Sequence, residues 1–231
     1  MPGAALAILA AGASSRVGSD KILADLGGRP VLEWSLAAGR AAGVFSQTIV
    51  VAAAERVPGL RRLVATIDPA ARVVEGGPTR TASAWCAVDA APDADVLAIH
   101  DAARPFAPPG LFARAVKAAG QDGSAVPGLA VTDTVRRTDD AGTARGELDR
   151  AGLWLAQTPQ AFRRELLLRA RAEVGGDSFP DDAAALVAAG IPVRMVPGER
   201  RNLKITTIED LAYARELVAC GMVGLPAVRV G

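Results

Sequence analysis

Short runs of apolar residues recur along the chain and predict buried β-strands. They lie at residues 6–9, 49–51, 96–99 and 193–196. Between the first three runs, apolar residues recur with helical spacing, so strands are expected to alternate with helices. Because the runs lack regular polar alternation, the strands should be buried on both faces. The pattern predicts an α/β fold, in which a mainly parallel sheet is covered by helices on each side.

Two of the predicted helices have recognisable ends. Pro30 is expected in the first turn of a helix that stops near Gly43. Thr207, followed by Asp210, predicts a capping pair at the start of the last helix. We expect that helix to pack on the sheet through one apolar face, formed by Ile208, Leu211, Ala212, Ala214, Leu217 and Val218.

Residues 132–156 depart from this alternation and predict an antiparallel arm. A turn signal at 139–142 follows the strand-like segment 134–138, and a second such segment lies at 153–155. A protruding hairpin cannot bury both of its faces within one chain. We therefore expect the arm to pack on a second subunit, which predicts a homodimer.

Length and composition indicate one large folded domain. The 231 residues are 50% apolar and 22% charged, which excludes intrinsic disorder and a small disulfide-stapled protein. Since no internal repeat or linker divides the chain, residues 1–231 are expected to form a single domain. Lys and Arg number 26 against 25 Asp and Glu, a balance that is not typical of proteins coating nucleic acid or anionic membranes. Any anion site must therefore be local.

The cysteines and the first apolar run favour a cytoplasmic protein. Cys86 and Cys220 are too few for a disulfide framework or a metal cluster, and both lie in apolar stretches typical of buried, inert thiols. The apolar segment 4–13 follows no Lys or Arg and is far shorter than the roughly 20 residues of a membrane helix. We expect it to form a buried strand, with neither a membrane nor nucleic acid as a partner.

The loop after the first strand has the composition of a phosphate-binding loop. Residues 9–21 are mostly small, which lets backbone amides approach a ligand, and they include the cations Arg16 and Lys21. Exposed amides together with fixed cations can hold a polyphosphate. The loop matches neither the Walker motif nor the dinucleotide-binding fingerprint. A plain tight turn is the alternative interpretation.

The loop that follows the run at 96–99 places an acid and a base at a strand end. Burying the charges of Asp101 and Arg104 near a core costs free energy unless they bind a ligand or form an ion pair with each other. An ion pair that stiffens the turn is the alternative. The only histidine, His100, is expected to be structural and hydrogen-bonded rather than catalytic, and one histidine cannot form a multi-histidine metal site.

Near the last helix, Lys204 lies between Leu203 and Ile205 in a strand-like segment. A lone lysine is normally a solvated surface residue. Here, however, its two apolar neighbours can point to the core while the lysine points into a cleft.

These motifs together resemble the nucleotidyltransferases that join a nucleoside triphosphate to a phosphorylated small molecule, most closely the 2-C-methyl-D-erythritol 4-phosphate cytidylyltransferases. The resemblance covers nearly the whole chain. It rests on Ala10-Ala11-Gly12 with Arg16 and Lys21, His100 to Pro105, Asp133-Thr134, Asp149-Arg150, Gln157-Thr158-Pro159-Gln160 and Leu203-Lys204-Ile205-Thr206. It implies a Rossmann-like three-layer α/β/α nucleotidyltransferase fold. The implied activity is transfer of CMP from CTP to 2-C-methyl-D-erythritol 4-phosphate in non-mevalonate isoprenoid synthesis.

The resemblance also implies roles for individual residues. CTP would be held by Ala10, Ala11, Gly12, Gly76, Gly77, Ser83 and Ala102. The catalytic residues would be Arg16, Lys21, Lys204 and Arg150, and Mg²⁺ or another divalent cation would bridge the CTP phosphates. The acceptor would be bound by Asp101, Arg104, Thr134, Arg150 and Thr158, with Thr134 and Arg150 supplied by the arm of the other subunit.

The chain departs from the family pattern at three places. Asp20 replaces the usual proline before Lys21, and the short spacing from Arg16 is similar to that of molybdopterin-type relatives. Pro180 precedes Asp181-Asp182 where many members have threonine. The chain also ends too soon for the cyclase domain fused to some relatives. The alternatives are therefore another nucleotidyltransferase of the same fold, acting on molybdopterin or a sugar phosphate, or a non-catalytic nucleotide-binding module.

Overall fold

The computed structural model describes residues 3–12, 20–175 and 178–227. Within them, eight strands form one sheet, and two more form a separate hairpin. The predicted strand runs at 6–9, 49–51 and 96–99 all lie in the sheet, and the run at 193–196 enters it only from Met195. The sheet strands are β1 (Ala4–Leu9), β2 (Gln47–Ala52), β3 (Arg72–Glu75), β4 (Val96–Asp101), β5 (Ser124–Ala130), β8 (Trp154–Ala156), β9 (Gln160–Arg163) and β10 (Met195–Pro197).

The sheet is mainly parallel, and its order is β10-β5-β9-β4-β1-β2-β3. Strands β3, β2, β1 and β4 are mutually parallel, while β9 runs antiparallel between β4 and β5. Leu9 pairs with both Val51 and Asp101, so the carboxyl ends of three neighbouring strands meet at one edge. In open α/β sheets, ligands bind beyond such an edge.

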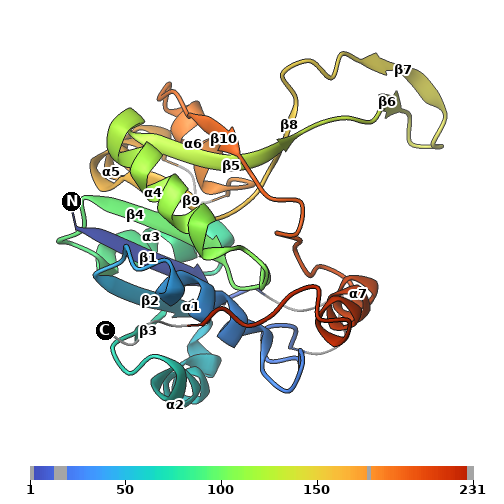
Figure 1. Ribbon diagram of the computed structural model, residues 1–231. Helices are drawn as coiled ribbons and strands as arrows, with labels where there is room; N and C mark the ends of the chain where they lie inside the picture. The colour runs from blue at the N-terminus through green and yellow to red at the C-terminus, as the bar shows by residue number, and fades with distance from the viewer. Residues whose placement is uncertain (1–2, 13–19, 176–177, 228–231) are drawn as a thin grey trace.

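Helices cover both faces of the sheet (Figure 1). One core is formed with α1 (Val31–Ala41), α2 (Val57–Ile67) and α4 (Pro109–Asp122), and the opposite core with α3 (Arg80–Ala90), α5 (Arg164–Val174) and α6 (Asp182–Ala188). In β1, Leu6 and Ile8 face the first core, whereas Ala5 and Ala7 face the second. Successive side chains of a strand point to opposite faces, which explains why the predicted runs lack polar residues.

Helix ends lie close to the predicted ones. Helix α1 begins at Val31, with Pro30 at the N-cap, and ends two residues before Gly43, whose φ is 65°. The last helix, α7 (Ile208–Ala219), has a complete capping box in which the Thr207 and Asp210 side chains each accept a backbone hydrogen bond. A short 3₁₀ turn, η1 (Ala54–Arg56), precedes α2.

The prediction that the last helix packs on the sheet is wrong. Leu211, Ala214 and Leu217 of α7 pack instead in a third cluster with Trp34 of α1 and with the loop residue Phe106. Both sheet faces are already covered by other helices, and α7 lies off the sheet in Figure 1. For the same reason Ile208, which was expected on the buried face, is 49% exposed.

Of the predicted residues 132–156, those up to 153 form an arm that projects from the sheet (Figure 1), and β8 at 154–156 returns to the sheet. Its strands β6 (Val135–Thr138) and β7 (Ala144–Leu148) pair antiparallel, and Gly142, with φ at 79°, lies in the turn between them. Almost every residue of both strands is exposed. The predicted segment at 153–155 does not join this hairpin, because β8 pairs with β5 of the main sheet.

The expectation of two buried thiols is wrong for Cys220. Cys86 on α3 is half-buried, whereas Cys220 is exposed at the end of α7. It follows Leu211 by nine residues, which places it on the opposite side of a helix with about 3.6 residues per turn. Among the described residues, no helix is both long enough and apolar enough to cross a membrane.

Candidate active site

A pocket of about 330 Å³ lies at the carboxyl ends of β1 and β4. Residues 9–12 and 77–79 form part of its wall, and Lys21, Asp101 and Lys204 also line it. A smaller pocket of about 150 Å³ shares Arg80, Asp101 and Lys204 with it. The smaller pocket is otherwise lined by Arg104, Ala156, Gln157, Thr158, Gln160, Pro180 and Asp181. The two pockets form one cleft with a larger and a smaller compartment.

Close packing requires small residues in and behind the wall of the larger compartment. A Cβ atom on Gly76 would lie 2.7 Å from Ser83 Oγ and 2.9 Å from Val51 Cγ1, and one on Gly77 would lie 2.4 Å from Ala82 Cβ. Ser83 itself is buried, and its hydroxyl lies within donating distance of the Thr79 and Gly77 carbonyls, at 2.9 and 3.2 Å. This packing brings the turn before α3 against the first loop.

The structure brings most of the predicted nucleotide-binding residues together. Ala10, Ala11, Gly12, Gly77 and Ser83 line the larger compartment. The two that remain lie just behind its wall. Gly76 packs against Ala11 and Ser83. Ala102 is fully buried, and its N–H donates to Leu9 O at 3.1 Å. The residue that lines the pocket here is therefore its neighbour Ala103. Arg16 lies outside the described residues.

His100 is structural, as expected. It is fully buried, with its Nε2 atom 3.1 Å from Arg104 O and its Nδ1 atom 3.0 Å from Thr158 Oγ1. A carbonyl oxygen can only accept, so Nε2 carries the proton and Nδ1 accepts from the Thr158 hydroxyl. Burial lowers the pKa of His100 to about 4. The imidazole is therefore neutral at pH 7 and fixes the turn after β4.

Asp101 is the centre of a charged cluster. Its Oδ2 atom lies 2.8 Å from Lys204 Nζ, its Oδ1 atom lies 3.2 Å from Arg80 Nη2, and Arg104 Nε is 4.0 Å from Oδ2. Burial alone would raise the pKa of the Asp101 carboxyl, but Arg80 and Lys204 beside it hold that pKa well below its usual range. The carboxyl is therefore ionised, and its closest cation is Lys204 rather than the predicted alternative partner, Arg104.

Arg104 and Thr158 are tied to the backbone around the smaller compartment. Arg104 Nη1 donates to Asn202 O at 2.7 Å, and burial lowers the pKa of its guanidinium. The Thr158 hydroxyl accepts from the Asp101 N–H at 3.0 Å while donating to His100. Asn202 is fully buried and donates to Thr158 O at 2.8 Å. These bonds join the segment after β8 to the segment that carries Lys204.

Lys204 points into the cleft as the sequence predicts, although its segment is not a strand. Ile205 is fully buried, its N–H donates to Ala103 O at 2.8 Å, and Leu203 packs on the third core cluster. The Asp210 carboxylate accepts from the N–H groups of Thr206 and Thr207. The Asp210 carboxylate therefore anchors the segment that aims Lys204 at Asp101.

Lys21 lines the same compartment as Lys204. Its neighbour Asp20 forms an ion pair with Arg56 of η1 at 3.3 Å. The acidic residue that replaces the family's proline thus has a cationic partner of its own.

Sequence reasoning missed Arg80, the first residue of α3. Arg80 lines both compartments and contacts Asp101 and the buried Asp182. A signal was available, because a cation in the first turn of a helix is unfavourable with respect to the helix dipole unless carboxylates surround it. Asp182 entered the sequence reasoning only through a departure from the family pattern.

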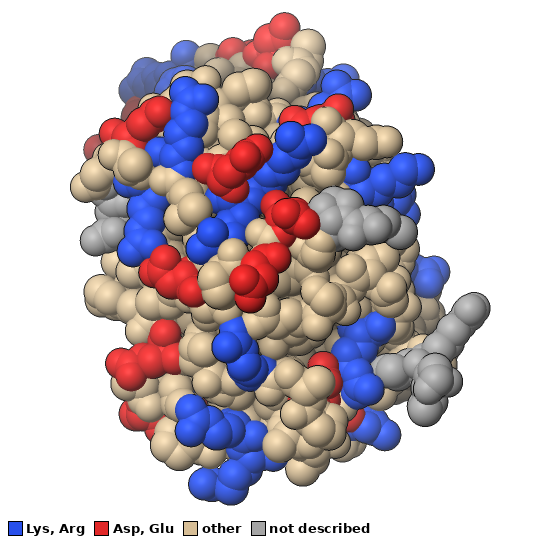
Figure 2. All heavy atoms as spheres, turned by 90° about the vertical axis from the view of Figure 1, so that its left-hand side faces the viewer, with Lys and Arg blue, Asp and Glu red and all other residues tan. Residues whose placement is uncertain are grey.

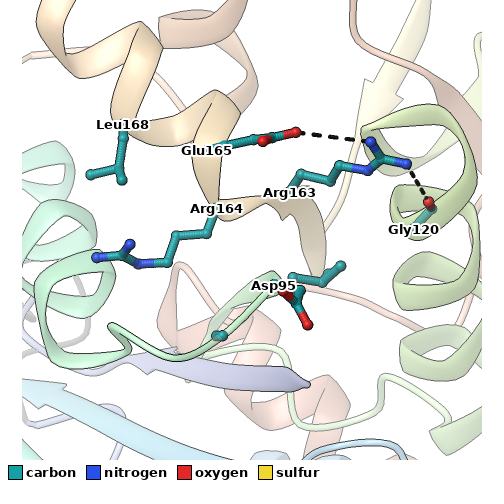
Figure 3. A pocket seen from close by; sticks show the side chains of 8 residues that line it. Asp95, Gly120, Arg163, Arg164, Glu165 and Leu168 are labelled. Atoms are coloured by element: carbon teal, nitrogen blue, oxygen red, sulfur yellow. Dashed lines mark hydrogen bonds and ion pairs between the residues drawn. The ribbon is translucent and has the colours of Figure 1, made fainter. Parts of the chain in front are cut away.

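A second hollow of about 470 Å³ lies at the opposite end of β4 and is lined by Asp95, Arg163, Arg164 and Glu165 (Figure 3). Although it is larger, its charged groups already have partners. Arg163 donates to Gly120 O at 2.8 Å, and Arg164 donates to Val88 O at 3.1 Å. Asp95 accepts from the Gly3 N–H at 2.8 Å. We therefore place the chemistry in the cleft at the carboxyl ends of the strands.

Comparison with known proteins identifies the family. The sequence model of the family described as "IspD: 2-C-methyl-D-erythritol 4-phosphate cytidylyltransferase" matches residues 4–219. The chain belongs to this family. It is 42% identical over 223 residues to the 2-C-methyl-D-erythritol 4-phosphate cytidylyltransferase of Cereibacter sphaeroides (strain KD131 / KCTC 12085), covering 92% of this chain and 95% of that protein. This confirms the predicted family and enzyme class.

Another relative is longer than this chain. The chain is 44% identical over 220 residues to the bifunctional enzyme IspD/IspF of Anaeromyxobacter sp. (strain Fw109-5), with 92% of this chain and 56% of the relative covered. The chain thus spans about half the length of this bifunctional relative.

Solved structures confirm the α/β fold class. The 2-C-methyl-D-erythritol 4-phosphate cytidylyltransferase of Thermus thermophilus superimposes with a TM-score of 0.77 at 36% identity, covering 95% of this chain and all of that chain. The 4-diphosphocytidyl-2C-methyl-D-erythritol synthase of Anaerococcus prevotii DSM 20548 gives 0.82 at 26% identity, with 94% of this chain and 99% of that chain covered.

Two residues that the IspD resemblance assigns to the acceptor do not line the cleft of their own chain. Thr134 and Arg150 are exposed on the arm, and Arg150 Nη1 donates to Thr132 O at 2.7 Å. Their contribution to a partner's cleft stays a prediction.

At the second departure from the IspD pattern, Asp181 caps α6. It accepts from Ala184 N and from Gln160 Nε2, both at 2.8 Å. Pro180, which stands where many members have threonine, borders the smaller compartment without offering a hydroxyl group.

Proposed function

We propose that the protein transfers CMP from CTP to 2-C-methyl-D-erythritol 4-phosphate, giving 4-(cytidine 5′-diphospho)-2-C-methyl-D-erythritol and pyrophosphate. The observation that carries the proposal is the convergence of Lys21 and Lys204 with the backbone of residues 9–12 around one pocket. Membership of the IspD family supplies the identities of the two substrates.

The chemistry of the cleft suits this reaction. An oxygen of the acceptor phosphate attacks the α-phosphorus of CTP, and the bond to the β-phosphate breaks so that pyrophosphate leaves with the electron pair. Both reactants are anions, so their repulsion is the main obstacle, and fixed cations together with alignment lower it. No general base is required because the attacking oxygen is already ionised. Arg16, Lys21 and Lys204 supply the positive charge in this proposal.

The two compartments suit the two substrates. The larger one offers small residues and backbone groups from residues 9–12 and 77–79, together with Ser83, for CTP. The smaller one offers Arg104 and Thr158 for the acceptor. Asp101 and Lys204 lie at the boundary between the compartments, where the reacting phosphates would meet.

A divalent cation such as Mg²⁺ is proposed to bind mainly through the CTP phosphates. Among the described residues, no three His, Cys, Asp or Glu side chains are grouped so that they could hold a metal ion. Asp101 is the carboxylate that lines the larger compartment, and it is already paired with Lys204. Mg²⁺ commonly binds through substrate phosphates with one or two carboxylates, so the residues present fit this mode. When bound, the cation would neutralise part of the triphosphate charge.

We also propose a homodimer in which each arm completes the partner's cleft. Exposed large apolar side chains gather on the arm and on the strand that leads back from it. They are Leu148, Leu153, Trp154 and Leu155. Such side chains favour contact with another subunit. Thr134 and Arg150 would then bind the acceptor phosphate in that subunit's cleft.

The cytoplasm is the proposed location. Both cysteines are free thiols, which suits a reducing compartment. On the face seen in Figure 2, Lys and Arg are interspersed with Asp and Glu. That distribution supports small anionic substrates rather than nucleic acid or a membrane surface as partners.

Pyrophosphate release tests the proposed reaction. With CTP and Mg²⁺, the protein should turn over with 2-C-methyl-D-erythritol 4-phosphate and not with sugar 1-phosphates or molybdopterin. Turnover with another acceptor alone would reassign it within the nucleotidyltransferases. Calorimetric binding of CTP without turnover on any acceptor would show a nucleotide-binding module instead.

Mixed dimers test whether the cleft is shared. Arg150→Ala should raise the KM for the acceptor at least about tenfold, as expected for loss of a charged hydrogen bond to phosphate. A mixed dimer of Arg150→Ala and Lys204→Ala chains contains one cleft with both residues intact and should regain activity. If mixing restores none, each cleft is built from a single chain.

A further inference from the structure

We propose that Arg80 is a positioning residue that shares the Asp101 carboxylate with Lys204, so that Lys204 can leave Asp101 for the phosphates of CTP. The inference rests on the proposed function, because it assigns Lys204 to the reacting phosphates. In the structure, Lys204 Nζ lies 2.8 Å from Asp101 Oδ2. To act on a phosphate, Lys204 must weaken or break this contact.

Arg80 and Lys204 bind opposite oxygens of the same carboxylate. Arg80 Nε and Nη2 lie 3.3 and 3.2 Å from Asp101 Oδ1, whereas Lys204 uses Oδ2. Two cations so close together repel each other, and each lowers the net attraction of the carboxylate for the other. If Arg80 were absent, Asp101 would hold Lys204 more strongly.

A second carboxylate fixes Arg80 in this position. Arg80 Nη2 lies 2.9 Å from Asp182 Oδ2, and the Asp182 side chain is only 3% exposed. Burial raises the pKa of Asp182, and Arg80 opposes that rise. Arg80 Nη1 is buried and makes no hydrogen bond within the described part of the chain. The guanidinium of Arg80 is therefore held in place by the two carboxylates, although one of its N–H donors has no hydrogen-bond partner among the described residues.

The charges of the cluster show why Arg80 matters to Lys204. Four cations (Lys21, Arg80, Arg104 and Lys204) and three carboxylates (Asp101, Asp181 and Asp182) line or adjoin the two compartments. The excess of one positive charge favours an incoming phosphate. Removal of Arg80 would leave Asp101 with Lys204 as its only cation within 3.5 Å among the described residues.

A purely structural role for Arg80 is the competing explanation. Arg80 joins the start of α3 to the start of α6, and loss of that link would lower stability and the folded fraction. It would not change turnover per folded active site or the reactivity of the Lys204 amine. These two readouts therefore separate the explanations.

The test uses variants that avoid an uncompensated buried carboxylate. Arg80→Ala combined with Asp182→Asn is compared with Asp182→Asn alone, and Arg80→Lys is the conservative variant. Relative to Asp182→Asn, the double variant should lose about tenfold in kcat, less than the loss of a direct transition-state contact. The KM for CTP should change less than about threefold. Arg80→Lys should lie between the double variant and wild type.

Lysine labelling tests the same inference without activity. The chain has three lysines, Lys21, Lys117 and Lys204, so acetic anhydride labelling can be followed for each by mass spectrometry. Lys117 on the outer surface of α4 is the internal reference. Stronger retention by Asp101 should slow labelling of Lys204 about tenfold in the double variant, because an ammonium group held in an ion pair reacts less readily with the anhydride.

The outcomes separate the two proposals. Wild-type protein that makes no pyrophosphate, but whose Lys204 labelling responds to Arg80, would overturn the proposed function alone. A double variant with the kcat and Lys204 labelling rate of Asp182→Asn would overturn the role of Arg80. A raised KM for CTP at unchanged kcat would also overturn it, because Arg80 would then be a simple binding contact.

Discussion

Two arginine-containing hollows at opposite ends of β4 differ in what their charges do. In the hollow of Figure 3, the Arg163 and Arg164 side chains point in opposite directions, and each donates to a backbone carbonyl. In the cleft, Arg80, Arg104 and Lys204 converge on the single carboxylate of Asp101. In the larger hollow each arginine has its own partner, whereas in the smaller one three cations share one carboxylate.

The comparison indicates that the reactive site is marked by several charged side chains around one group, rather than by the volume of the cavity. Within the described part of the chain, Arg163 and Arg164 share no carboxylate, whereas Arg104 donates to Asn202 O and also lies beside Asp101 in the shared cluster. Buried N–H groups without partners, Arg80 Nη1 and Arg104 Nε among the described residues, occur in the cleft. Most buried polar groups in natural proteins have a hydrogen-bond partner, so these two N–H groups mark a place where a ligand oxygen could accept a hydrogen bond.

The largest effect should come from removing a cation of the cleft. Lys204→Ala and Lys21→Ala should each lower kcat at least about a hundredfold, the scale of losing one positioned transition-state donor. Circular dichroism should show an unchanged fold. Arg163→Ala in the other hollow is the matched control and should keep kcat within about twofold. Near-normal turnover of both lysine variants would remove them from the catalytic residues.

A smaller effect is expected from acid, through the histidine beneath the cleft. Burial depresses the pKa of His100 from 6.5 to about 4. Between these values the unfolded chain binds a proton that the folded chain does not, so stability present above pH 6.5 is lost as the pH falls. From pH 7 to pH 5, urea denaturation should show a loss of about 2 kcal/mol in the free energy of unfolding.

His100→Asn provides the control for this titration. Burial raises the pKa of Asp182, so its titration changes stability in the opposite direction. The quantity to compare is therefore the difference between wild type and His100→Asn at each pH. If that difference does not change between pH 7 and pH 5, protonation of His100 is not coupled to unfolding.

The sequence predicted best what depends on local pattern. The apolar runs of β1, β2 and β4 needed only the rule for strands buried on both faces, and the capping box of α7 needed only Thr207 and Asp210. The cleft could be anticipated because the ends of parallel strands meet at one edge, which brought residues 9–12 and Asp101 together.

What depends on distant packing was not predictable in the same way. Helix α7 presents an apolar face, but the pattern cannot show that other helices already cover the sheet. Strand β8 is adjacent in sequence to the arm, yet it pairs with β5. Arg80 gains its meaning only from Asp101 and Asp182, which lie 21 and 102 residues away in the sequence.

A still smaller effect is expected where the fold supports Lys204 without touching it. Thr207→Ala removes the side-chain acceptor for Asp210 N, which lies at 3.3 Å, and should cost about 1 kcal/mol of stability. Asp210 would still accept from the N–H groups of residues 206 and 207, so kcat should stay within about twofold. Urea denaturation and the pyrophosphate assay measure the two quantities. A large loss of kcat would show that the cap itself aims Lys204.

The smallest effect is expected in the hollow of Figure 3. Arg163 and Glu165 form an ion pair at 3.8 Å, and their side chains are 44% and 73% exposed. Exposed pairs contribute little because solvent screens them, so Glu165→Gln should change the free energy of unfolding by less than about 0.5 kcal/mol. It should leave turnover unchanged, because Arg163 keeps its bond to Gly120 O. A loss well above 1 kcal/mol by urea denaturation, or any change in KM for CTP, would mean that charge at this end of the sheet is coupled to the cleft.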